Sequence, residues 1–149
     1  MAEKDALSAH VVDAPVGTPA LDIVISAPSY GHPLVLMSMT PEVVVDGVVA
    51  ARGWGRWIVP VGPGAHSVVV YVNRFGEFQY PAQLEVEVPA AARATVYYRL
   101  PALRHCSAAI GTTPQRSAGA GAMAILLLLP VVMAVAGLAL VVLLLIAVA

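Results

Sequence analysis

The last 27 residues of the chain, from Met123 to Ala149, contain no charged side chain and read MAILLLLPVVMAVAGLALVVLLLIAVA. An α-helix rises about 1.5 Å per residue, so this run would extend ~40 Å, whereas the hydrocarbon core of a bilayer is about 30 Å thick. A core helix of a small soluble domain has a polar face, and this run has none. The sequence therefore predicts one transmembrane α-helix over residues 123–149, with the lipid bilayer as a partner.

The position of this run predicts how the protein reaches the membrane. The N-terminal residues, MAEKDALSAHVVDAPVGTPA, lack an apolar run as long as that of a signal peptide. Only the C-terminal run could then direct the chain to a bilayer, which predicts a tail-anchored, single-pass protein. Arg104 and Arg116 precede the run and no charge follows it, so the positive-inside rule places the N-terminal domain in the cytoplasm.

The remaining ~120 residues are enough for one domain with a modest core. The net charge is −1 and Lys and Arg do not cluster, which argues against nucleic acid as a partner. The single cysteine, Cys106, excludes an intramolecular disulfide. Seven arginines against one lysine, together with much Ala, Val, Gly and Pro, are typical of a GC-rich bacterial genome.

Between residues 21 and 100 the apolar side chains recur with the period of a strand. The segment LEVEV places Leu84, Val86 and Val88 on one face and two glutamates on the other. Asp46-Gly47 stands between two β-branched runs and is the strongest hairpin signal in the chain. The other candidate strands are 21–26, 34–40, 52–59, 66–73 (with Val68, Val70 and Val72 inward) and 93–100, and residues 74–82 are expected to form a loop.

Six to eight short strands separated by turns predict an all-β class, here a small antiparallel β-sandwich followed by the transmembrane helix. The expected organisation is a disordered leader over residues 1–20, the sandwich over 21–100, a flexible tether over 101–122 and the helix over 123–149. The tether prediction depends on the Ala, Gly, Ser, Thr and Pro content of that segment.

Two turn motifs are similar to those of a known family. VVVDG (Val43–Gly47) ends in Asp-Gly, and VPVGPGAHSVVVYV (Val59–Val72) contains Pro-Gly-Ala-His before a β-branched strand. With the closing strands LEVEV and ATVYYRL, residues 41–100 resemble the PEGA-type β-sandwich modules. The Gly-x-Thr-Pro stretch usual in these modules is replaced here by Trp54-Gly55-Arg56-Trp57. The resemblance implies a module attached to membrane or envelope proteins, without catalytic residues and with a role in interactions.

The residues offer no motif for catalysis or for a cofactor. The four histidines (His10, His32, His66 and His105) are dispersed, and neither a Gly-x-Ser-x-Gly elbow nor a Cys/His arrangement is present. No pair of His or Cys has metal-ligand spacing, and no Gly-rich stretch precedes Lys-Ser/Thr. We therefore expect no enzyme, no metal and no cofactor, and we expect His66 to close a turn.

Trp54 and Trp57, flanked by arginines, form the candidate ligand-binding site together with Arg56. Tryptophan is enriched at interfaces because it offers a large area and a polar N–H. Residues three apart on one strand face opposite sides, so one tryptophan is expected in the core and the other outside.

Two functions follow from these observations. The first is a non-enzymatic interaction or scaffold module that binds another protein, favoured by a bare sheet edge suited to strand addition. The alternative is a module that binds carbohydrate or another envelope ligand through the Trp54/Trp57 region, favoured by an exposed aromatic pair.

Overall fold

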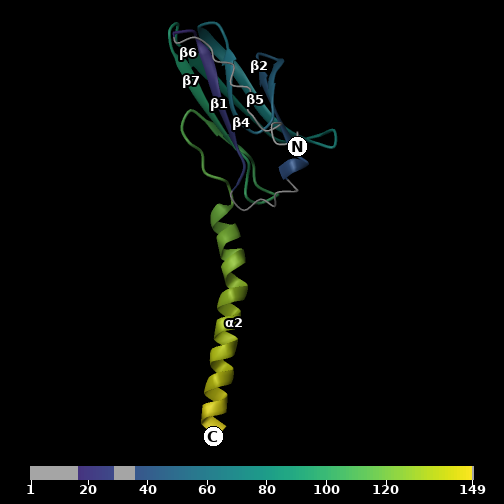
Figure 1. Ribbon diagram of the computed structural model, residues 1–149, viewed down its shortest axis with the longest axis vertical. Coiled ribbons are helices and arrows are strands. Elements are labelled where there is room, and N and C mark those ends of the chain that lie inside the picture. The colour runs from purple at the N-terminus through teal and green to yellow at the C-terminus, as the bar shows by residue number, and fades with distance from the viewer. Residues whose placement is uncertain (1–16, 29–35, 149) are drawn as a thin grey trace, which may run out of the picture.

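The computed structural model describes residues 17–28 and 36–148, which form eight β-strands and one long C-terminal helix (Figure 1). The strands are β1 (Ala20–Ser26), β2 (Thr40–Val45), β3 (Val48–Arg52), β4 (Gly55–Pro60), β5 (Gly64–Arg74), β6 (Glu77–Val88), β7 (Arg93–Arg99) and β8 (Ala109–Gly111), and the helix is α2 (Ala120–Val148). Most of the leader predicted over residues 1–20 lies outside the described residues, and β1 begins at its last residue.

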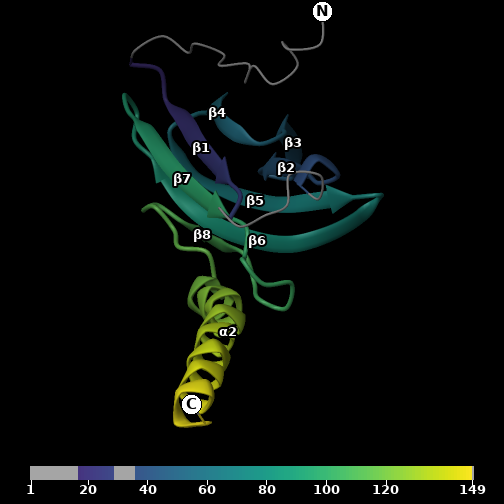
Figure 2. The same ribbon diagram turned by 60° about the horizontal axis from the view of Figure 1, so that its bottom comes forward.

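The strands form two four-stranded sheets, in the orders β4-β1-β7-β8 and β3-β2-β5-β6. Figure 2 shows the sheets as two layers above the helix. Buried side chains of both sheets belong to one hydrophobic cluster, which includes Leu21, Ile23, Val43, Val68, Val70, Val96 and Tyr98. The structure is thus mostly β with one apolar C-terminal helix, which agrees with the predicted class.

The strand pairs are antiparallel with one exception, because β1 and β7 pair in parallel from Ala20↔Arg93 to Ser26↔Arg99. The expectation of a wholly antiparallel fold is wrong here. Parallel neighbouring strands need a long connection. The chain between β1 and β7 is long enough, because it contains all four strands of the other sheet.

The predicted alternation within the strands is confirmed. Val86 and Val88 are buried and Leu84 is half-buried against the core, whereas Glu85 and Glu87 are exposed. The inward residues of β5, which are Val68, Val70 and Val72, are fully buried. The Asp46-Gly47 hairpin is also confirmed: β2 and β3 pair up to Val45↔Val48, and both turn residues have positive φ (50° and 83°), as a type I′ turn requires.

Three expected local structures differ from those observed. Within the candidate strand 34–40, Leu36 and Met37 are helical, and β2 begins only at Thr40. The candidate strand 52–59 is interrupted by a turn at Gly53 and Trp54, so that β4 begins at Gly55 and lies in the other sheet.

The expected loop 74–82 is the third difference. Only Phe75 and Gly76 form a turn there, and β6 begins at Glu77. A bulge follows in β6, because Val70 pairs with Ala82 and Val72 with Gln79. Tyr80 lies in the bulge with φ of 54°, and its carbonyl accepts a hydrogen bond of 2.8 Å from the buried Tyr98 hydroxyl. This bond joins the two sheets.

Residues 101–119 differ from the flexible tether expected there. β8 pairs with the end of β7, Ala102 N–H donates to the Ala118 carbonyl (2.9 Å), and Arg99 donates to the Ser117 hydroxyl (2.9 Å). Composition could not predict this, because the segment is held by its pairing with β7, by hydrogen bonds to residues far along the chain and by packing of Ala108 and Ile110 against the core.

Helix α2 begins three residues before the predicted start and continues through Pro130 to Val148. None of its described residues is buried. Its length and composition suffice to cross a membrane, so the helix is compatible with a membrane anchor.

Candidate functional site

The two tryptophans do not divide between the core and the surface as predicted. Trp54 lies in the β3–β4 turn, where the alternation of a strand does not apply, and Trp57 lies in β4 opposite Ile23. Both indoles are partly buried and pack against the core cluster. The expectation that one of them faces outward is therefore wrong.

The polar groups of the predicted site all have partners within the protein. The indole N–H of Trp54 donates to the Met39 carbonyl at 2.9 Å, and that of Trp57 donates to the Gly53 carbonyl at 3.0 Å. Arg56 forms a bidentate ion pair with Asp22, with Nε 2.7 Å from Oδ1 and a second bond to Oδ2. The three residues are thus close together, and their contacts hold β4 to its surroundings.

Charge in this region is balanced locally. Asp22 is only 4% exposed, whereas the Arg56 side chain is 62% exposed. The carboxylate, first through the hydrogen bond and then through its charge, raises the pKa of the Arg56 guanidinium. An anionic ligand at Arg56 would have to compete with the Asp22 carboxylate, which already occupies the guanidinium group.

His66 joins two turns, which confirms its predicted role. Its Nδ1 lies 2.6 Å from Asp46 Oδ2, and its Nε2 lies 2.8 Å from the Gly62 carbonyl oxygen. Both partners accept hydrogen bonds, so the arrangement favours a ring with a proton on each nitrogen. The bond to Asp46 and that to the Gly62 carbonyl raise the pKa of His66, and the bonds from His66 and from the Ser67 N–H lower the pKa of Asp46.

The β5–β6 hairpin exposes both phenylalanines of the chain. Phe75 is 85% exposed at the turn, and Phe78 is 67% exposed three residues later. Phe75 has φ of 53°, a conformation that is rare for a bulky residue. Sequence reasoning placed both in a loop and missed them as a site, although two aromatic residues beside a glycine, in FGEF, were a readable signal.

Neighbouring side chains contact each phenylalanine, and the Arg74 guanidinium lies 5.7 Å from the centroid of the Phe75 ring. The Phe78 ring meets the Tyr71 ring edge-on, with centroids 4.8 Å apart. The Tyr71 hydroxyl donates to Glu42 Oε2 at 3.0 Å, and Asn73 donates to Glu42 Oε1 at 3.3 Å. Burial and the Glu42 carboxylate raise the pKa of Tyr71. This network on one sheet face gives the base of the hairpin a fixed surface.

The two edges of the β3-β2-β5-β6 sheet offer little room for strand addition. β3 has five residues, and a bulge leaves Ala50 without a partner on β2, although Val48 and Val49 are exposed (69% and 43%). On the opposite edge of that sheet, β6 is longer but contains the bulge with Pro81. Bulges and prolines in an edge strand hinder its pairing with a strand of another chain.

Among residues 17–28 and 36–148, no group of three or more His, Cys, Asp or Glu side chains could hold a metal ion. Cys106 is a free, half-buried thiol.

The fold and these surfaces define the class of the protein as a β-rich domain with one apolar C-terminal helix. Comparisons with protein-family models, with curated proteins and with solved structures found no match. The similarity to PEGA-type modules therefore stays a prediction that depends on the two turn motifs.

Proposed function

We propose that this chain is a non-enzymatic, tail-anchored membrane protein whose PEGA-like β-sandwich is a protein-interaction module on the cytoplasmic side. The observation on which the interaction role depends is the exposure of both phenylalanines of the chain on the β5–β6 hairpin. Exposed apolar patches mark interaction sites, and aromatic residues, phenylalanine among them, are enriched in protein interfaces.

The anchor is supported by α2. It has 29 residues, hence a length of about 44 Å, and contains no charged residue. None of its described side chains is buried against the domain, so its apolar surface needs another apolar environment. Arg104 and Arg116 before the helix favour a cytoplasmic domain.

Two observations support the PEGA-like sandwich. The core cluster draws side chains from both sheets, as in a sandwich. Asp46 and His66, which belong to the two turn motifs of the resemblance, are hydrogen-bonded to each other.

The backbone at Phe75 favours the interaction role over chance exposure. Phe75-Gly76 forms a two-residue hairpin turn with positive φ at both positions (53° and 87°), where a bulky residue is unfavourable, so a phenylalanine at this position supports a role for its exposed side chain. The alternative carbohydrate site at Trp54, Arg56 and Trp57 has less support, because both indole N–H groups and the guanidinium already have internal partners.

Site-specific photocrosslinking in native membranes tests the interaction. A benzophenone amino acid replaces Phe78 in the full chain, and in a matched control it replaces Glu85, an exposed residue of the same strand far from the turn. We expect a discrete protein adduct from position 78 that disappears when Phe75→Ser is added. Adducts only to lipid at position 78, or the same protein adducts from position 85, would contradict the proposed module.

Thiol labelling tests the topology. In a Cys106→Ser background, Ser8→Cys supplies one thiol in the N-terminal segment, and intact cells are treated with an impermeant maleimide. A cytoplasmic domain is labelled only after permeabilisation. Labelling of intact cells would place the domain outside and would favour envelope ligands.

A further inference from the structure

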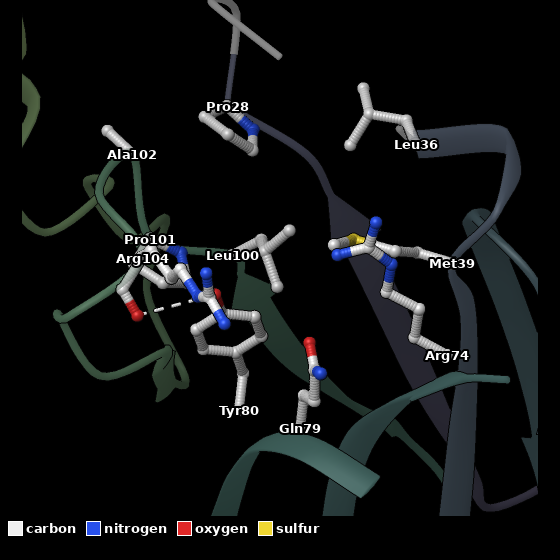
Figure 3. Close-up of a pocket in the computed structure, with 10 residues that line it drawn as sticks. All are labelled: Pro28, Leu36, Met39, Arg74, Gln79, Tyr80, Leu100, Pro101, Ala102 and Arg104. Carbon is white, nitrogen blue, oxygen red and sulfur yellow. Dashed lines mark hydrogen bonds between the residues drawn. The ribbon is translucent and has the colours of Figure 1, made fainter. Parts of the chain in front are cut away.

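A cavity of about 210 Å³ lies where the domain meets the helix. Its walls come from one end of both sheets: Arg74 ends β5, Leu100 follows β7 and Met39 precedes β2 (Figure 3). The adjoining Ala102, which also lines the cavity, donates its N–H to the carbonyl of Ala118, two residues before α2. The cavity therefore lies at the end of the domain nearest the proposed membrane.

Two guanidinium groups reach this cavity from opposite sides. In the view of Figure 3 the Arg74 guanidinium lies on the Met39 side of Leu100 and that of Arg104 on the Tyr80 side, with Gln79 below and between them. The Nε atom of Arg74 is buried and has no hydrogen-bond partner. Within the described part of the chain, the ion pairs involve Arg52, Arg56 and His66, and neither cavity arginine takes part.

The Arg74 guanidinium lies 5.7 Å from the centroid of the Phe75 ring, but this contact offers no acceptor to its buried Nε–H, which favours an anionic ligand. Arginine stays charged at every physiological pH, so the charge cannot be relieved by loss of a proton. A buried donor without an acceptor is unfavourable by itself, and an oxyanion would supply the acceptor. The planar fork of arginine matches the oxygens of phosphate, which it binds through two parallel hydrogen bonds.

The rest of the cavity limits the size and character of the ligand. Leu36, Met39 and Leu100 make part of the lining apolar. The volume equals that of roughly seven liquid waters and is below the range of pockets for drug-sized ligands. It has room for a phosphate group with a few neighbouring atoms, and none for a whole lipid.

We propose that this cavity binds a phosphate group through Arg74 and Arg104. The group has two sources, an anionic lipid headgroup at the membrane surface or a soluble phosphate. The lipid source rests on the proposed membrane anchoring, whereas binding of soluble phosphate does not. The apolar lining and the position beside α2 fit the lipid source.

One carboxylate near the two arginines reduces their attraction for an anion. Glu77 lines the adjoining hollow, which shares Arg74 and Arg104 with the cavity. Its negative charge repels an anion, so Glu77→Gln should tighten phosphate binding while both arginines remain.

The experiment uses the full chain in nonionic detergent with three probes: inorganic phosphate, phosphatidylglycerol and phosphatidylcholine. Lipid retention is measured by native mass spectrometry, and phosphate binding by the shift in unfolding temperature. Arg74→Gln and Arg104→Gln should each weaken binding about tenfold, because each removes charge-assisted hydrogen bonds to the anion. Arg116→Gln is the matched control, since it removes an exposed charge near α2 that does not line the cavity.

Retention of phosphatidylglycerol above phosphatidylcholine, lost in both cavity variants and kept in Arg116→Gln, supports the lipid source. Binding of inorganic phosphate alone, with the same variant pattern, supports the soluble source. Arg74→Lys, which keeps the charge, should retain part of the binding and excludes misfolding as the cause of a loss. No binding of any probe, or equal losses in Arg116→Gln, would overturn the site. Flotation with phosphatidylcholine vesicles measures anchoring separately, so its failure is distinguishable.

Discussion

At the scale of single residues, the Asp46–His66 pair joins the two turns at one end of the domain. Asp46 also accepts a bond of 2.9 Å from the Ser67 N–H, and its own N–H donates to the Ser67 carbonyl. The side chain of Asp46 is half exposed, so solvent and salt screen its charge. The pair is therefore a pH-sensitive contact of modest strength.

Stability should depend on pH through this pair. His66 has a pKa raised above 6.5, so its contribution is complete below pH 6.5 and is lost as the pH rises through the raised value. Asp46 has a pKa lowered from 3.8, so its contribution is present above pH 3.8 and is lost as the pH falls through the lowered value.

We expect the unfolding temperature of the full chain in detergent, followed by circular dichroism, to fall on the alkaline side. In the variant Asp46→Asn the asparagine tolerates positive φ but carries no charge. The decrease in unfolding temperature at alkaline pH should therefore be smaller in this variant. His105→Gln, at an exposed histidine, should leave it unchanged. An alkaline fall of equal size in Asp46→Asn would show that the pair is not its cause.

Substitution of Val86 tests whether this residue belongs to the core. It is 4% exposed, so Val86→Asp forces a carboxylate without a partner into an apolar interior, which costs several kcal/mol and should abolish cooperative unfolding. Glu85→Gln, on the exposed face of the same strand, should change the free energy of unfolding by about 0.5 kcal/mol or less. Retained cooperative melting of Val86→Asp would place Val86 in solvent.

At the scale of elements, the junction between β8 and α2 couples the domain to the helix. Gly119 has φ of 79°, and a Cβ there would lie 3.0 Å from Leu103 carbons and 3.1 Å from Cys106 Sγ. The backbone conformation therefore favours glycine, and a Cβ there would force the Leu103 and Cys106 side chains to shift. The segment 101–106 lies against the base of the helix because no side chain separates them.

Gly119→Ala should loosen this junction. The strain of a side chain at positive φ costs about 1–2 kcal/mol, and the contact with Cys106 must open. We expect faster reaction of Cys106 with a maleimide in the full chain. Gly121→Ala is the matched control, because a Cβ there meets nothing within 4 Å. Equal labelling rates for Gly119→Ala and the unaltered chain would argue against a packed junction.

At the scale of the whole molecule, the domain and α2 have opposite solvent requirements. The domain has a cluster of buried apolar side chains drawn from both sheets, whereas no described side chain of α2 is buried. The length and composition of α2 suffice to cross the hydrocarbon core of a bilayer, so the helix is compatible with a membrane anchor.

Shortening the helix should release the protein from membranes at a defined length. A chain ending at Pro130 keeps about 16 Å of helix, half of a bilayer core, and should be extracted by alkaline carbonate. A chain ending at Val142 keeps about 34 Å and should resist extraction. Membrane retention of the shorter chain would contradict α2 as the anchor.

The local chemistry of the sequence is sufficient to predict the apolar helix, the alternating strands and the Asp46-Gly47 turn. A type I′ turn depends on two residues that tolerate positive φ, and the inward positions of β6 depend on period two. Each property is local in the chain, so the sequence by itself determined it. For the same reason His66 was recognised as a turn residue.

Tertiary structure alone decided the features that depend on distant residues. Contacts between segments far apart in the chain determine the parallel pairing of β1 with β7 and the hydrogen bonding of residues 101–119. They also determine the partial burial of both Trp54 and Trp57. The convergence of Arg74 and Arg104 on one cavity is of the same kind. Hydrophobic period specifies which face of a strand is buried, but not its neighbour or its direction, because those depend on how the whole chain packs.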